Sequence, residues 1–188
     1  AAVPQGAGAM AAVLGLEDEQ VKALCAAAAQ GEVVEAVNFN SPGQVVIAGH
    51  AAAVERAMNA AKEAGAKRAL PLPVSVPSHC SLMKPAAEKL AEALQSVKID
   101  RPKIRVIHNA DVASYDDAEK IKDALVRQLY SPVRWTETVN ALVSYGLTES
   151  AECGPGKVLA GLAKRINKEA VCTALTNIEQ VTAFVETH

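Results

Sequence analysis

The stretch 74–80 (Val-Ser-Val-Pro-Ser-His-Cys) contains the side chain best suited to chemistry, His79. An imidazole titrates near neutral pH, so a histidine held at the surface can act as a general base. Pro77 fixes its own φ and favours extended geometry at Val76. The pattern therefore predicts that His79 is presented at the end of a strand covering 67–76. Two interpretations remain: a catalytic base, or a core or capping histidine whose nitrogens are satisfied locally.

Two asparagines are further candidates. Asn40 begins the turn 40–43 (Asn-Ser-Pro-Gly), where it either binds substrate amides or holds the turn through an Asx bond. Asn109 follows a predicted strand at 104–108, at the carboxyl end where open α/β sheets bind ligands. His108 should point the other way by strand alternation, which favours a structural role.

The order of predicted elements in the first half is strand, helix, strand, strand, helix, strand. The turn 40–43 separates two β-rich runs, as in a hairpin. This order is typical of the ferredoxin-like split βαβ unit, βαββαβ. We place that subdomain at 6–76. The predicted strands are 8–16, 33–39, 44–49 and 67–76, and the helices are 17–30 and 50–64.

Strands alternate with helices in the second half, 77–188, which predicts part of a parallel sheet covered on both faces. Three strands form only part of such a sheet, so we expect the rest to come from the N-terminal side. The predicted strands are 104–110, 147–153 and 170–175, and the helices are 81–97, 121–130, 135–145, 157–166 and one from 178. The turn Gly154-Pro155-Gly156 is either a tight strand-to-helix connection or an anion site at a helix N-terminus.

The composition narrows the possible partners. The 188 residues carry a net charge of −2, which gives no reason to expect nucleic acid. No apolar run approaches the roughly 20 residues that span a membrane. The four cysteines have no metal-ligand spacing, so we expect buried free thiols in a reducing cytoplasm and no metal site. They are Cys25, Cys80, Cys153 and Cys172.

Four blocks resemble one family, the malonyl-CoA:acyl carrier protein transacylases of bacterial type II fatty acid synthesis. The likeness runs from about Gly8 to about Asn177; acyltransferase domains of polyketide and type I fatty acid synthases are more distant relatives. The blocks are NFNSPGQVVIAG (38–49), LPVSVPSHCSLMKPAAEKL (72–90), LVRQLYSPVRW (125–135) and ECGPGKVLAGLAKRI (152–166).

The resemblance implies an α/β-hydrolase-like core with an inserted ferredoxin-like subdomain, and ping-pong transfer of malonyl from coenzyme A to the phosphopantetheine thiol of acyl carrier protein. It implies that His79 activates the serine nucleophile and that the backbone carbonyl of Gln128 orients His79. Without the family, Gln128 would be interpreted as a polar position late in a solvated helix. No tightly bound cofactor is implied; malonyl-CoA is the substrate.

The resemblance also indicates what the chain lacks. No G-x-S-x-G segment occurs, so we expect the C-terminal portion of the enzyme, inactive alone. The alternatives are a nucleophile-less module that binds acyl carrier protein or coenzyme A, and a polyketide synthase acyltransferase domain with another extender unit. Ser78 lies in the four-residue stretch 76–79, whose sequence correlates with the extender unit in modular relatives. A serine at this position does not determine which acyl group is transferred. Basic residues that could receive acyl carrier protein are Lys67, Arg68, Lys84, Lys164 and Arg165.

Overall fold

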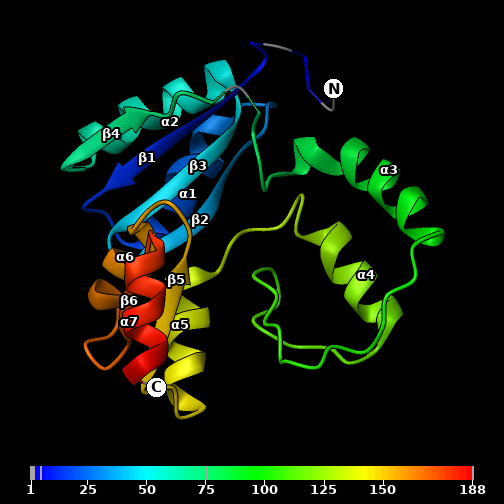
Figure 1. Cartoon of the computed structure of the whole chain (residues 1–188). Coiled ribbons are helices and arrows are strands. Elements are labelled where there is room, and N and C mark those ends of the chain that lie inside the picture. The colour runs from blue at the N-terminus through cyan, green and yellow to red at the C-terminus, as the bar shows by residue number, and fades with distance from the viewer. Residues whose placement is uncertain (1–2, 5, 75, 188) are drawn as a thin grey trace. The chain divides into compact units, whose positions relative to one another are not determined.

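The computed structural model describes residues 3–4, 6–74 and 76–187 (Figure 1). The chain forms two compact units, Ala1–Trp135 and Thr136–His188, and each is described by itself. The predicted division into 6–76 and 77–188 stays a prediction.

The first unit is built on a four-stranded antiparallel sheet in the order β2-β3-β1-β4. Strands 33–39 and 44–49 were predicted to form a hairpin, and β2 and β3 confirm it, with Ser41 opposite Gln44. Gly43 takes a φ of 72°, which glycine adopts readily, in the turn between them. The elements, in the predicted βαββαβ order, are β1 (Gly8–Leu14), α1 (Asp18–Ala29), β2 (Val34–Ser41), β3 (Gln44–His50), α2 (Ala51–Glu63) and β4 (Arg68–Pro71).

Side chains alternate between the two faces of this sheet, and each face carries a buried apolar cluster. On one face, α1 and α2 cover residues such as Val13 and Ile47. The opposite face has a second apolar cluster, which includes Cys80 from the segment that carries His79. That segment is therefore part of the packing of the sheet. The second cluster consists of Met10, Val37, Val46, Ala48 and Cys80.

Strand β2 contains two irregularities in its pairing with β3, which leave Val37 and Asn40 without partners in the register. An extra residue in one strand reverses which face the following side chains occupy. Val34 and Phe39 consequently pack into the same cluster although their numbers differ in parity.

Strand β4 is shorter than the predicted strand at 67–76, so the prediction that His79 lies at the end of a strand is wrong. The strand ends at Pro71. Pro71 and Pro73 lack the N–H donor that a sheet ladder needs. Ser75 lies outside the described residues.

The predicted strand at 104–110 is also wrong. Within the described ranges, its only strand-like pairing is an isolated bridge between His108 and Ala113. A strand forms only where backbone groups have a partner along its length. Here Ile104 is 81% exposed and Val106 53% exposed, so this apolar run is not part of any sheet.

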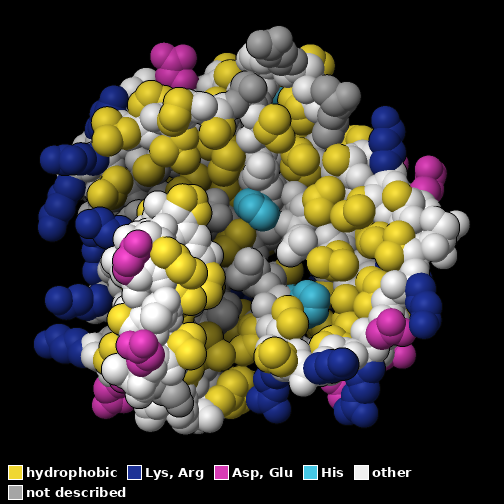
Figure 2. All heavy atoms as spheres, viewed as in Figure 1, with side chains coloured by type: hydrophobic (Ala, Val, Ile, Leu, Met, Phe, Trp, Pro, Cys, Tyr) yellow, Lys and Arg dark blue, Asp and Glu magenta, His cyan; other side chains and the backbone are white. Residues whose placement is uncertain are grey.

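The first unit also contains a helix pair. The predicted helix at 81–97 is observed as a 3₁₀ turn, η1 (Ser81–Met83), followed by α3 (Lys84–Gln95). Helix α4 (Ala118–Arg127) packs against α3. Figure 2 shows hydrophobic side chains gathered over the four-stranded sheet on one face of the molecule.

The second unit contains a two-stranded parallel sheet, in which Glu149 lies opposite Val171. The predictions at 147–153 and 170–175 are confirmed, but the predicted third strand is missing. The elements are α5 (Trp135–Ser144), β5 (Glu149–Cys153), α6 (Val158–Ile166), β6 (Val171–Leu175) and α7 (Ile178–Thr187). Over the part of the chain described, no helix is both long and apolar enough to cross a bilayer.

All four cysteines are free thiols, but the prediction that all are buried is wrong, because Cys153 is exposed and Cys172 is half-buried. Burial raises the pKa of Cys25 to about 12, and the charge of Glu35 adds to the effect. Burial likewise raises the pKa of Cys80 to about 11.

We therefore expect alkylation of the folded chain at pH 8 to modify Cys153 first. Cys25 and Cys80 should react only after urea unfolds the chain, because they are buried and protonated. Peptide mapping after timed iodoacetamide treatment measures this order. Labelling of Cys80 in the folded chain as fast as that of Cys153 would contradict it.

Candidate active site around His79

His79 is held through both its ring and its backbone. Its Nδ1 lies 2.8 Å from the backbone oxygen of Gln128, which confirms the predicted hydrogen bond. Its backbone N–H donates to the carbonyl of Leu129 at 3.1 Å. Because a carbonyl only accepts, Nδ1 carries the proton. In the neutral ring, Nε2 is then left with a lone pair, as a general base requires.

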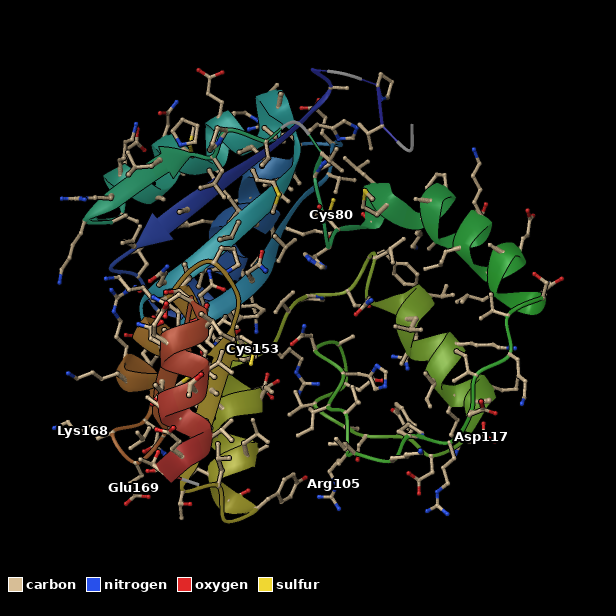
Figure 3. The ribbon with its side chains drawn as sticks, in the orientation of Figure 1. Cys80, Arg105, Asp117, Cys153, Lys168 and Glu169 are labelled. Carbon is tan, nitrogen blue, oxygen red and sulfur yellow. The ribbon has the colours of Figure 1, made fainter. Side chains whose placement is uncertain are left out.

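The residues on either side of His79 are anchored in the first unit. Pro77 and Cys80 are fully buried, and the Cys80 thiol donates to the carbonyl of Pro77 at 3.1 Å. Cys80 lies where the chain approaches α3 beside the sheet (Figure 3). His79 itself is half-buried and takes a φ of 66°, which is uncommon for a residue with a Cβ. The buried neighbours hold it in that conformation.

Just after His79, Ser81 is bound by Glu35 of β2. The Ser81 N–H donates to Glu35 Oε2 at 3.1 Å, and the Ser81 hydroxyl donates to Glu35 Oε1 at 2.5 Å. Glu35 was not among the residues predicted to belong to the site. An acidic residue between apolar neighbours at the start of β2 was the signal that could have revealed it.

The carbonyl of Gln128 is positioned by the same sheet. Gln128 caps the end of α4, and its N–H donates to Ala124 at 3.0 Å. A few residues on, Val133 forms a parallel bridge with β2. The Phe39 N–H donates to Val133 at 3.0 Å, and the Val133 N–H donates to Val37 at 2.8 Å. Both partners of the His79 hydrogen bond are thus attached to one rigid sheet.

An ion-pair network fixes the end of α4 next to Gln128. The Arg127 guanidinium binds both carboxylate oxygens of Asp111 and also donates to Asp123 at 2.6 Å. The Tyr115 hydroxyl donates to Asp111 at 2.9 Å. Arg127 lowers the pKa of Asp111 below its ordinary value. This pair was not predicted from the sequence, because residues 111 and 127 are brought together only by the fold.

Asp111→Asn should lower the free energy of unfolding by about 1–3 kcal/mol at pH 7, because charge-assisted bonds to Arg127 are lost. A carboxyl with a lowered folded pKa stabilises above its unfolded pKa, and that contribution disappears as the pH falls through the folded value. The difference between wild type and variant should therefore shrink below about pH 4. Urea titrations from pH 7 to pH 3 measure it; a difference independent of pH would contradict it.

The other predicted site residues lie near this framework. Ser78 is half-buried beside His79, and its N–H donates to Val76 at 2.9 Å. Asn40 is half-buried on β2, at one of the two irregular positions. Asn109 lies in a turn, and its carbonyl accepts the Arg134 N–H at 3.3 Å. The structure therefore connects the segment 133–134 both to β2 and to Asn109.

His108 and the turn 154–156 are accounted for by internal contacts. His108 is 7% exposed, its N–H donates to Ala113, and its ring lies 5.6 Å from that of Tyr115. In the second unit, the carboxylate of Glu152 accepts the Ala160 N–H of α6 at 2.8 Å. A side chain of the protein thus binds at the helix N-terminus, which favours the tight-turn interpretation.

Comparison with known proteins identifies the family to which this chain belongs. Residues 2–184 match the family model described as "Acyl transferase domain". The malonyl CoA-acyl carrier protein transacylase of Escherichia coli K12 is 55% identical over 98% of this chain, and that of Haemophilus influenzae is 57% identical over 98%. The chain belongs to the malonyl CoA-acyl carrier protein transacylase family. It spans about 60% of the length of these relatives.

Solved structures of the family agree. An acyl carrier protein S-malonyltransferase from Vibrio cholerae superposes with a TM-score of 0.95 at 60% identity, over 97% of this chain and 60% of that one. A malonyl-transacylase in complex with its type II PKS acyl-carrier protein gives a TM-score of 0.98 at 52% identity, over 100% of this chain and 60% of that one. The mixed α/β fold described above is therefore that of transacylases in this family.

Proposed function

We propose that the whole protein to which this chain belongs transfers malonyl from malonyl-CoA to the phosphopantetheine thiol of acyl carrier protein. His79 is the general base of that reaction. The observation that carries the proposal is the 2.8 Å hydrogen bond between His79 Nδ1 and the Gln128 carbonyl, because it leaves Nε2 free to accept a proton. Family membership supports the substrate pair.

The mechanism has two half-reactions that share one nitrogen. In the first, Nε2 takes the proton of a serine hydroxyl as the serine oxygen attacks the thioester, and then gives that proton to the departing coenzyme A thiolate. In the second, Nε2 takes the proton of the phosphopantetheine thiol, which attacks the malonyl ester, and returns it to the serine oxygen. This chain contains no G-x-S-x-G segment, so the proposal assigns the serine to the rest of the full-length protein.

The proposal includes the finer architecture and partners. The sheet order β2-β3-β1-β4 with two helices on one face supports a ferredoxin-like subdomain, and family membership supports its insertion in an α/β-hydrolase-like core. Acyl carrier protein is the proposed partner, as in the complex of a relative. Asn40, Asn109 and Ser78 are proposed to contact substrate. No tightly bound cofactor, nucleic acid or membrane is part of the reaction, and the proposed location is the cytoplasm.

The full-length enzyme should exchange radiolabelled malonyl between coenzyme A and acyl carrier protein, whereas this chain alone should not, because it contains no G-x-S-x-G segment to supply the nucleophile. Malonyl-CoA, methylmalonyl-CoA and acetyl-CoA should be compared as donors. Preference for methylmalonyl-CoA would favour a polyketide extender role. Tight binding of acyl carrier protein without transfer by the full-length protein would favour the non-enzymatic binding module.

A further inference from the structure

Glu35 is an acidic side chain on the sheet face that the His79 segment covers. Val33, just before β2, and Val37 lie two positions from Glu35 on either side, and both pack with Cys80 on that face. A carboxylate on a packed face needs hydrogen-bond donors, since burying an unsatisfied charge is costly. Ser81 supplies two of them, at 3.1 and 2.5 Å.

These two bonds hold the chain two residues beyond His79. Ser81 is the first residue of η1, which continues directly into α3. A carboxylate at the start of a helix is favoured by the helix dipole. Glu35 therefore attaches the start of this helical segment to β2, an edge strand of the four-stranded sheet.

The backbone of His79 needs such an attachment. Its φ of 66° is unfavourable for a residue with a Cβ and persists only where the surroundings impose it. Buried Pro77 fixes the chain before His79, and Glu35, through Ser81, fixes it after. Relaxation to a negative φ would turn the His79 N–H away from Leu129 and the ring away from Gln128.

We propose that Glu35 is a positioning residue: by clamping Ser81, it keeps His79 in the left-handed conformation that aims Nδ1 at the Gln128 carbonyl. The kinetic consequence rests on the function proposed above. The structural consequence does not, because it concerns only contacts within this chain.

Amide hydrogen exchange of this chain tests the structural consequence. Glu35→Ala should lower protection of the His79 and Ser81 amides about tenfold or more, because charge-assisted bonds are lost. The Ile47 amide, in the centre of the sheet, should keep its protection. The matched control is Glu32→Ala, which removes a carboxylate paired with Arg56 at 2.8 Å in the same unit. This control should leave His79 protection unchanged.

A kinetic test uses the full-length enzyme. Glu35→Ala should lower kcat about tenfold or more with KM changed less than about twofold, since misplacing a base affects chemistry more than binding. Glu35→Gln, which keeps the size and one acceptor oxygen, should recover part of the loss. Adding Glu35→Ala to His79→Ala should cost nothing further, because the clamp acts through His79.

Unchanged protection of His79 in Glu35→Ala would overturn the proposal. If Glu35→Ala does not fold, Ser81→Ala and Glu35→Gln test the proposal instead. Full protection of the His79 amide in both variants would also overturn the proposal. If His79→Ala keeps wild-type activity, the proposed function fails, while the exchange result still decides whether Glu35 positions His79.

Discussion

Replacing His79 by alanine in the full-length enzyme should lower the rate of malonyl transfer about 10²–10⁴-fold, which is the usual contribution of a positioned general base. A serine hydroxyl is a weak nucleophile until a base takes its proton. Because the proposed mechanism assigns Nε2 to both half-reactions, formation of the malonyl-enzyme and its transfer to acyl carrier protein should both slow. Single-turnover measurements with malonyl-CoA, and with preformed malonyl-enzyme, follow the two steps separately.

The matched control is Gln128→Ala. It removes the side chain but keeps the carbonyl that His79 Nδ1 contacts at 2.8 Å, so its activity should stay close to wild type. The opposite pattern, with His79→Ala active and Gln128→Ala inactive, would require a different base and a side-chain role for residue 128.

Gly49→Ala should destabilise the first unit by about 3 kcal/mol, at the upper end of the usual cost of overpacking. A Cβ at this position would lie 2.0 Å from the backbone oxygen of Val33 and 2.7 Å from the Cα of Val34. These are backbone atoms of the neighbouring strand, so no side chain can move to relieve the clash. The edge strand β2, which carries Glu35 and the bridge to Val133, should separate from β3. Urea denaturation monitored by circular dichroism measures the loss.

Gly161→Ala is the control for a glycine-to-alanine change as such. Its Cβ would have nothing within 4 Å, and the residue lies inside α6. Alanine favours helix over glycine by about 1 kcal/mol, so this variant should be as stable as wild type or more stable. A Gly49→Ala chain that unfolds at the wild-type urea concentration would show that β2 is not packed as closely as described.

Local sequence patterns were sufficient to predict elements whose contacts are between segments close in the sequence. The hairpin 33–49 could be predicted because alternating apolar residues and a Pro-Gly turn select it without distant contacts. The strand at 104–110 could not, because a strand also needs a partner, and a β-rich sequence such as 104–107 does not reveal whether one is present. Strand β4 ends at Pro71, five residues before the predicted end at residue 76, and this proline is visible in the sequence.

The candidate site, like the fold, was predicted from the sequence only in part. His79 and the Gln128 carbonyl were predicted together because the family resemblance connects residues 49 positions apart. The left-handed backbone of His79 was not predicted, since no glycine signals it and its surroundings in the fold impose it. Side chains that act through the tertiary fold leave little trace in local spacing.

The most direct test of the central claim is the tautomer of His79 in the neutral ring. Ring ¹⁵N chemical shifts of this chain at pH 8, assigned with His79→Ala, report which nitrogen carries the proton. The account predicts a protonated Nδ1, donating to Gln128, and a bare Nε2 that can accept a proton from serine. A ring protonated at Nε2 would contradict it, because Nδ1 could not then donate to the carbonyl and no lone pair would face the nucleophile.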